Sequence, residues 1–575
     1  MAISEPSSTV IEFLGSSGRA PSTWGQRAIW RSIRWMRSDS AYFNLQRCVA
    51  VPDGVPAEQV LAALRAVVER HEVLRTLFTD TTDCTVQEVV AHGAIAVTLR
   101  SSPDEPTKSA AAALAAELVS RPFRHEREFG LRLAVLSHGD APRWIAIAVS
   151  HLIMDMTALH VVERDLTALL GGAELPPPRW TPRQEAERQA DPSGAARGRA
   201  ALRFWERGLT AVPRSHFDHP PAPGAAADDP ERFLRLRLES PAGAVAASAL
   251  ADRCSTTTSV VLLAAAAVVL AGRSRHPVAA LQLIAGNRNE DRLRELVGAQ
   301  AENALFVLDL PDGDFEDAIR ASYRPALSAY RHSGYDPMAW AELLDRVALR
   351  RGSPPDLAAF FNDARMGDRW DDLEAARGAE AFHSRTALEA LAAKSAVRFI
   401  GSWPRQDARY FVHASYSPDA LHLNLMADTH YLSRPELERL LFSMERLLLD
   451  SVFDRVHIRD AVEPELRVGR PADWILADGS WCDPGAVAHQ VSEAAGGARV
   501  VMETAPTGPT AGHPDRPLTA VVTGGPEGLS IQELHARVVD GSQGAPHITA
   551  PQWYVLRTAA GLTVAEGSGR PDGEG

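Results

Sequence analysis

The sequence predicts an α+β protein made of two mixed lobes followed by a small C-terminal module. Helical and strand patterns are interspersed in residues 21–175, the N-terminal lobe, and again in residues 231–455, the C-terminal lobe. Residues 176–230 between them are rich in proline, alanine and glycine, which is typical of a crossing between lobes. After about residue 455 glycine and proline increase and the strands shorten, so residues 456–566 are expected to form a small separate α/β module.

In the N-terminal lobe, residues 1–20 are small and polar, and we expect a flexible lead-in. An amphipathic pattern with proline near its first turn predicts a helix over Pro56 to Val67. The other predicted elements of this lobe are strands at 86–91, 94–100, 131–137 and 144–149, and helices at 108–120 and 157–170.

The C-terminal lobe opens with a strongly alternating strand at 233–238. Its further predicted elements are a helix at 257–272, strands at 278–285 and 305–310, a helix at 314–331, the segment 357–365, a strand at 421–426 and a helix at 434–449. In the C-terminal module, strands are predicted at 499–502 and 518–522, a helix at 530–539, and a disordered tail at 567–575.

Composition excludes several classes of function. The chain has 575 residues, 45% of them hydrophobic and 23% charged, which is typical of a soluble globular protein. Its net charge of −13 gives a nucleic-acid role no electrostatic support. The longest apolar run, Val260 to Ala271, is too short to span a membrane, and the first 22 residues lack the pattern of a signal peptide. A reducing cytoplasm is therefore the expected setting.

The cysteines do not predict a metal or disulfide framework. Cys48, Cys84, Cys254 and Cys482 are widely separated and form no C-x-x-C pair. A metal site formed by His151, Asp155 and His160 is conceivable from side-chain types alone, but further ligands are not identified, so no metal is predicted.

The strongest candidate for chemistry is the connection after the apolar strand at 144–149. His151 and Asp155 lie between this strand and the helix at 157–170, and such loops often present reactive side chains. A histidine there can act as a general base toward an amine or an alcohol. The alternative is that His151 is a hydrogen-bonded structural residue, and the residues alone leave both interpretations open.

Arginines also recur at helical spacing near the N-terminus. Arg27, Arg31 and Arg34 fall at positions i, i+4 and i+7 and share one face of a predicted helix. This stripe is either a solvated face or a docking surface for an acidic partner.

Four stretches together resemble the condensation domains of nonribosomal peptide synthetases, in the chloramphenicol-acetyltransferase-like superfamily. Thr23 to Trp30 is similar to the family's Ser-x-x-Gln-x-x-x-Trp motif, and Arg70 to Phe78 to its Arg-His-Glu-x-Leu-Arg-Thr-x-Phe motif. Ser150 to Met156 resembles the signature His-His-x-x-x-Asp-Gly. Residues 286–303 resemble Asn-Arg followed by Ile-Gly-x-x-x-Asn, although Asn303 lies one residue further from Gly298 than that spacing asks.

The resemblance implies two chloramphenicol-acetyltransferase-like lobes in a V with a central tunnel. It implies a free-standing acyltransferase of natural-product biosynthesis, in which the acceptor amine or alcohol attacks a thioester carried on the phosphopantetheine of a peptidyl or acyl carrier protein. We expect no cofactor bound by the chain itself, and neither a nucleic acid nor a membrane as a partner. Soluble acyl-coenzyme A is a further possible donor.

The resemblance also assigns roles to single residues. His151 takes the place of the second signature histidine and is the catalytic residue. Asp155 corresponds to the structural aspartate and Arg288 to the arginine that pairs with it. Two residues depart from the signature: Ser150 replaces the first histidine, whose role is mainly architectural, and Met156 replaces a glycine that leaves room at the tunnel.

These departures keep a second function open. Ser150 is expected to support the loop, while Met156, together with Asn303, is expected to shape the tunnel. The alternative function is a noncatalytic condensation-like platform that binds a carrier protein or recruits a tailoring enzyme.

The C-terminal module resembles, more faintly, the small subdomain of an adenylation domain. Asp483 to Val487, Leu518 to Val522, Leu529 to Val538 and Pro551 to Leu556 match its elements in order. The catalytic lysine of that subdomain has no counterpart, because no lysine follows Lys394. We therefore expect a docking or stabilising remnant, with an unrelated α/β appendage as the alternative.

Overall fold

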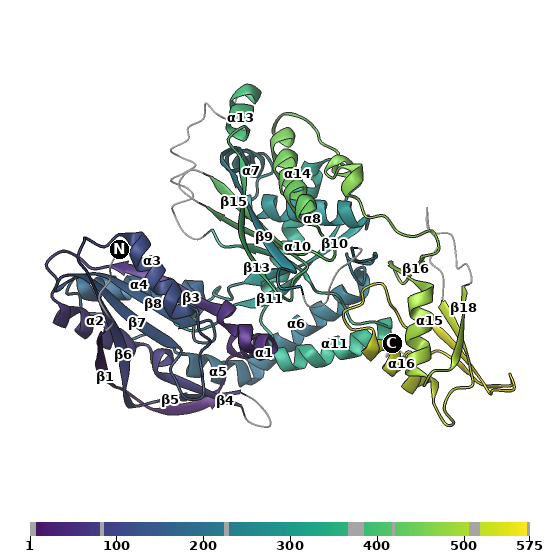
Figure 1. The fold of residues 1–575 in the computed structure, drawn as a ribbon, viewed down its shortest axis with the longest axis horizontal. Helices are drawn as coiled ribbons and strands as arrows, with labels where there is room; N and C mark the ends of the chain where they lie inside the picture. The colour runs from purple at the N-terminus through teal and green to yellow at the C-terminus, as the bar shows by residue number, and fades with distance from the viewer. Residues whose placement is uncertain are drawn as a thin grey trace. The chain divides into compact units, whose positions relative to one another are not determined.

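The computed structural model describes residues 7–80, 85–222, 229–365, 384–416, 420–504 and 518–571. Helices and strands are mixed throughout, and the predicted α+β class is confirmed (Figure 1). The chain divides into two compact units. The first comprises Met1–Ala200, Ala285–Glu302 and Gly334–Pro337, and the second comprises Ala201–Ile284, Asn303–Ser333 and Met338–Gly575.

A five-stranded sheet forms the centre of the first unit. Its order is β1 (Ser7–Leu14), β6 (His92–Ser102), β7 (Leu131–His138), β8 (Ala141–Ser150) and β3 (Asn44–Ala50). Only the β6–β7 pair is parallel. A smaller antiparallel sheet contains β2 (Gly18–Pro21), β5 (Thr85–Val89) and β4 (Thr76–Asp80).

Helices cover both faces of the five-stranded sheet. α2 (Ala57–Arg70) and α4 (Met156–Leu170) pack on one face through a core that includes Val67, Leu159 and Ile147. α3 (Lys108–Val119) packs on the other face through small residues such as Ala111 and Ala146. β8 is therefore buried on both sides, which explains its nearly continuous run of apolar residues.

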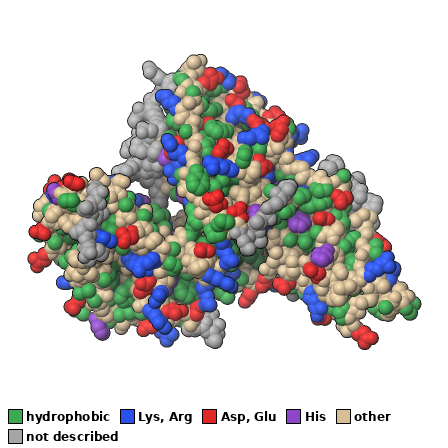
Figure 2. Space-filling model, in the orientation of Figure 1, with side chains coloured by type: hydrophobic (Ala, Val, Ile, Leu, Met, Phe, Trp, Pro, Cys, Tyr) green, Lys and Arg blue, Asp and Glu red, His purple; other side chains and the backbone are tan. Residues whose placement is uncertain are grey.

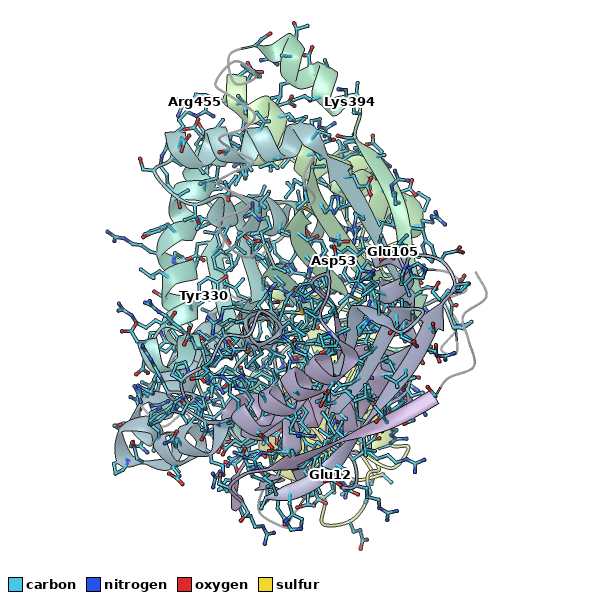
Figure 3. The ribbon with its side chains drawn as sticks, turned by 90° about the vertical axis from the view of Figure 1, so that its left-hand side faces the viewer. Glu12, Asp53, Glu105, Tyr330, Lys394 and Arg455 are labelled. Carbon is cyan, nitrogen blue, oxygen red and sulfur yellow. The ribbon has the colours of Figure 1, made fainter. Side chains whose placement is uncertain are left out.

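Residues 7–20, which we expected to be a flexible lead-in, instead form β1 and β2, so this expectation is wrong for them. β1 pairs with β6 over its whole length. Ile11 and Phe13 are buried, while Glu12 between them is exposed (Figure 3). The alternation was hidden by the serines, threonine and glycines around it.

α1 (Trp24–Met36) begins with a capping box, which gives a physical reason for the Thr-x-x-Gln pattern. Gln26 N donates to Thr23 Oγ1, and Thr23 N donates to Gln26 Oε1 at 2.8 Å. The remaining short elements of this unit are α5 (Pro182–Ala190), α9 (Asp291–Arg294) and the 3₁₀ turns Arg37–Phe43 and Glu72–Arg75, and α6 (Pro192–Ala211) leads into the second unit.

The arginines of the stripe on α1 have partners within the chain, although Arg31 and Arg34 stay exposed to solvent. Arg27 pairs with Asp336 at 3.0 Å, Arg34 pairs with Asp80, and Arg31 donates to Pro337 O at 2.7 Å. The expected solvated face therefore agrees with Arg31 and Arg34 but not with Arg27, and docking of an acidic partner stays a prediction.

The second unit is organised around a seven-stranded sheet. Its order is β11 (Glu302–Asp309), β10 (Val278–Ala285), β12 (Ala359–Asp363), β14 (Tyr410–Tyr416), β15 (Leu421–Asp428), β9 (Phe233–Ser240) and β13 (Ala396–Trp403). The helices of this unit are α7 (Pro241–Arg253), α8 (Thr258–Ser274), α10 (Phe315–Arg331), α11 (Pro337–Arg351), α13 (Arg385–Ala392) and α14 (Arg434–Phe453). α7, α11 and α13 were not predicted.

Residues 456–571 belong to this second unit. They contain the turns Ile458–Asp460 and Pro464–Leu466, strands β16 (Ile475–Ala477), β17 (Ser480–Cys482), β18 (Arg499–Thr504), β19 (Leu518–Thr523), β20 (Trp553–Arg557) and β21 (Thr563–Gly567), and helices α15 (Pro484–Ala494) and α16 (Ile531–Gly541). Their core includes Ala348 and packs against Leu349, both from α11. The module thus shares a core with the preceding lobe, and the predicted domain boundaries otherwise stay predictions.

Two features of the whole chain bear on its class. No single helix among the described residues is long and apolar enough to cross a bilayer; α7 and α8 pass that test only as a pair, with a bend of 106° between them. On the face shown in Figure 2, acidic and basic side chains are interspersed rather than gathered by sign.

Candidate active site

The loop between β8 and α4 carries His151 and is held by backbone hydrogen bonds. His151 N donates to Phe43 O at 3.0 Å, and Ser150 N donates to Gly130 O at 2.9 Å. A Cβ on Gly130 would lie 2.8 Å from Ile153 Cγ2, so only glycine permits this close approach. The loop is therefore fixed by backbone hydrogen bonds to Phe43 and Gly130 and by the close packing of Ile153 on Gly130.

His151 is half-buried as a residue, and its Nδ1 atom is buried without a hydrogen-bond partner among the described residues. Burial lowers the pKa of His151 below its usual value, while the Asp155 carboxylate opposes this shift. The imidazole is therefore neutral at pH 7 and can accept a proton.

Asp155 is the N-cap of α4 and has no role as a free acid. Its Oδ1 accepts from Ala158 N at 2.9 Å, and its Oδ2 accepts from Gln300 N at 3.1 Å. Arg288 Nη2 donates to both oxygens, at 2.8 and 3.0 Å. Asp155 is buried, so these donors replace the water that a carboxylate requires.

Arg288 connects the loop to the chain around residue 298. Besides Asp155, its guanidinium donates to three carbonyl oxygens, those of Leu293, Leu296 and Gly298, at 2.7 to 3.0 Å. The structure thus brings together Asp155 and Arg288, which are 133 positions apart in sequence.

α1 joins the same network. Thr23 Oγ1 lies 3.4 Å from Ala299 O, and a Cβ on Gly25 would lie 2.5 Å from that oxygen. Since Gln300 N binds Asp155, three stretches singled out in the sequence converge on one loop. Their shared task is to position the residues around His151.

Ser150 has a partner that no motif in the sequence indicates. Its Oγ lies 2.7 Å from His125 Nε2 and accepts from Leu152 N at 3.2 Å. Both side chains are buried, and burial lowers the pKa of His125 to about 4. A histidine from another segment therefore supports the loop, and no spacing in the sequence connects it to position 150.

The two residues expected to shape a tunnel lie on different elements. Met156 is the first residue of α4 and is 38% exposed. Asn303 lies on β11, in the second unit.

The charged residues of the stretch 70–78 have structural partners. Arg70 Nε and His71 Nε2 lie 2.8 and 3.0 Å from Asp165 Oδ2. Burial raises the pKa of Asp165, but hydrogen bonds from His71, Arg164 and Arg70 outweigh it and the pKa is lowered. This stretch therefore supports α4 through the contacts of Arg70 and His71 with Asp165.

Among the residues that the structure describes, no group of three or more His, Cys, Asp or Glu side chains could hold a metal ion. His160 instead lies within 3.3 Å of Arg47 and Glu163. Cys48, Cys254 and Cys482 are free thiols, and Cys84 lies outside the described residues.

The geometry can therefore supply one proton acceptor on a rigid loop. A neutral imidazole can take a proton from an attacking amine or hydroxyl, and such a base typically contributes about 10²–10⁴ in rate.

Comparison with known proteins bears on what this loop does. A family model described as the condensation domain matches residues 17–351. Phosphinothricin tripeptide synthetase PhsC of Streptomyces viridochromogenes is 27% identical over 315 residues, which are 52% of this chain and 29% of that protein. Nonribosomal peptide synthetase pboA of Aspergillus ustus is 29% identical over 150 residues, 26% of this chain and 6% of that protein. The chain thus spans less than a third of the length of these relatives.

Solved structures with the same fold cover more of the chain. The condensation domain of the Monacolin K polyketide synthase MokA matches 77% of this chain and 99% of its own, with a TM-score of 0.59 and 17% identity. The X-domain bound to OxyB from teicoplanin biosynthesis matches 78% of this chain and 96% of its own, with a TM-score of 0.56 and 18% identity. At these identities the likeness concerns the fold alone.

Proposed function

Because the chain belongs to the condensation-domain family, we propose that it is an acyltransferase that joins a carrier-bound acyl or peptidyl thioester to an amine or alcohol. The observation that carries the proposal is the neutral imidazole of the half-buried His151, on a loop fixed by the Asp155–Arg288 pair. The donor would be presented on the phosphopantetheine arm of a peptidyl or acyl carrier protein.

In the proposed reaction the acceptor nitrogen or oxygen attacks the thioester carbonyl carbon. His151 accepts the proton that the nucleophile loses, the carbon–sulfur bond breaks, and the thiolate takes up a proton to leave as the free carrier thiol. Asp155 and Arg288 act as positioning residues. Much of the rate would come from holding both reactants together, which can give effective molarities of about 10⁵ M or more.

The experiment that tests this proposal uses the full chain with carrier proteins loaded with acyl groups, and it follows the transferred group by mass spectrometry. His151→Ala is compared with His92→Ala, a change of an exposed histidine at the start of β6. Transfer that His151→Ala removes and His92→Ala retains supports the proposal. A parallel reaction with acyl-coenzyme A and no carrier distinguishes a soluble donor.

A platform without catalysis is the second candidate, and a specific observation favours it. Ser150 and Met156 depart from the signature, and a structure with the same fold is an X-domain in complex with OxyB. Gel filtration with loaded carriers distinguishes the two: stable binding without transfer from any carrier would favour the platform.

Met156 and Asn303 are proposed to select the substrate. A methionine where the family signature has glycine adds volume at the start of α4, and its exposure is compatible with contact to a ligand. Met156→Gly is therefore expected to widen the range of acceptors.

A further inference from the structure

The seven-stranded sheet of the second unit presents two arginines on the face opposite its helices. Leu234, Leu236 and Leu238 of β9 are buried, and α14 packs against β9 and β15 (Figure 1). Since side chains alternate along a strand, Arg235 and Arg237 lie side by side on the other face. Both are partly buried.

Strand register places polar residues beside Arg237. Asn424 on β15 is opposite Arg237, and His413 on β14 is opposite Asn424. Arg237 Nε donates to Asn424 Oδ1 at 2.9 Å, and Asn424 Nδ2 donates to His413 O at 3.1 Å and to Ser415 Oγ at 3.3 Å. This chain of hydrogen bonds fixes the direction of the guanidinium.

No carboxylate of the described residues forms an ion pair or a hydrogen bond with Arg237, although the charge of Glu239 acts on it from nearby. The hydrogen bond that the Arg237 side chain makes within the described residues goes to the neutral Asn424. Glu239, the nearest acid on the same strand face, is held by Arg398 Nε at 2.8 Å. The pKa of Arg237 is lowered by burial and by Arg235, and it is raised by Glu239.

His413 adds no charge to the surroundings of Arg237. Burial, Arg235 and Arg237 lower the pKa of His413 to about 4 although Asp363 raises it, so the ring is neutral at pH 7. The Arg235 guanidinium lies 4.9 Å from the centre of the Trp403 ring and forms one flank of the cluster.

We propose that this arginine cluster, formed by Arg235, Arg237, Asn424 and His413, binds a carboxylate of one of the two reactants. The fixed guanidinium of Arg237 offers its terminal N–H groups to a carboxylate in the planar two-bond geometry that suits both groups. The inference rests on the proposed acyltransferase function and adds a substrate class to it: an acyl or aminoacyl group with an acidic side chain. Condensation would leave this carboxylate unchanged.

The test compares the rates of transfer for matched acidic and amide substrates, used in turn as the carrier-bound donor and as the acceptor. The pairs are aspartyl with asparaginyl and glutamyl with glutaminyl. Wild type is expected to transfer one acidic member about 10- to 100-fold better than its amide, the range of a charge-assisted hydrogen bond. Arg237→Gln keeps a donor for Asn424 and should abolish this preference. Arg398→Gln, on the neighbouring strand and already paired with Glu239, should retain it.

Two further measurements make the outcomes distinguishable. Isothermal titration of glutarate against glutaramide tests binding without catalysis: glutarate should bind wild type and Arg398→Gln but not Arg237→Gln. If glutarate binds but no acyl group is transferred, the proposed acyltransferase function is wrong and the proposed carboxylate site is still supported. If wild type transfers the acidic and the amide substrates equally well, the proposed role of the arginine cluster in carboxylate binding is wrong. In a further outcome, Arg237→Gln lowers the transfer of the acidic and the amide substrate equally, and does so only when the carrier arm keeps its phosphate. That result would show that Arg237 recognises the phosphate, and it would overturn the proposed carboxylate site.

Discussion

His125 Nε2 and Ser150 Oγ lie 2.7 Å apart in the buried base of the loop that carries His151. Ser150 occupies the place of a signature histidine, and an imidazole from the segment before β7 reaches the same neighbourhood. The hydroxyl also accepts from Leu152 N. The loop is therefore held by a pair of side chains in which the histidine comes from another part of the chain.

Ser150→Ala should destabilise the protein because it leaves buried His125 and Leu152 N without this partner. We expect a loss of about 1–3 kcal/mol in the free energy of unfolding. Chemical denaturation measures this, with Ser8→Ala on the exposed side of β1 as the control. Equal stability of both variants would show that the hydrogen bond contributes nothing.

His125→Gln should flatten the dependence of stability on pH. The folded-state pKa of His125 is about 4, below its value of about 6.5 in the unfolded chain, so the unfolded state binds the proton first. Its contribution to stability is complete above pH 6.5 and is lost as pH falls toward 4. Wild type should therefore lose about 1.4 kcal/mol per pH unit more than His125→Gln in this interval. Parallel curves from urea titrations would contradict the assignment.

Asp155→Ala should cost about 3–5 kcal/mol of unfolding free energy, because it leaves Arg288 buried without its anion and removes the cap of α4. His151→Ala should leave thermal stability nearly unchanged. Asp53→Ala is the matched control, since Asp53 (Figure 3) is 96% exposed and lies 3.4 Å from Arg143. If Asp155→Ala and His151→Ala lose the same amount of stability, the distinction between Asp155 as a positioning residue and His151 as a catalytic residue is wrong.

His151→Ala should lower the rate of transfer by about 10²–10⁴. Because burial lowers the pKa of His151, the acid limb of the wild-type pH–rate profile should lie below pH 6.5. Stopped assays from pH 4.5 to 8 measure it. An acid limb above pH 6.5 would show that another group titrates.

Arg470→Met should separate the C-terminal module from the lobe. Asp218 is fully buried and accepts from Arg470, His276 Nε2 at 3.0 Å and Trp481 N at 2.7 Å. Removal of the arginine leaves the buried Asp218 carboxylate without its cation, and the free energy of unfolding should fall by about 3–5 kcal/mol. Limited proteolysis should then cut between residues 456 and 480, whereas Arg459→Met, an exposed change, should leave the pattern of wild type.

Much of the fold could be read from local patterns. Apolar alternation at 233–238 and the apolar run at 144–149 predicted β9 and β8, because burial on one face or on both leaves a direct trace in sequence. α7 escaped prediction since its alanines and glycine carry little periodic contrast, and β1 because serine and threonine mask its alternation.

The sequence by itself determined the α+β class, the family motifs and the identity of the candidate base, His151, because these depend on local periodicity and on short spacings. Only the tertiary structure decided that His125 supports Ser150, that the arginines of the stripe have partners within the chain, and that no carboxylate of the described residues pairs with Arg237. The physical reason is that hydrogen bonds and charge compensation are settled by neighbours in space. Those neighbours come from segments with no spacing rule to connect them.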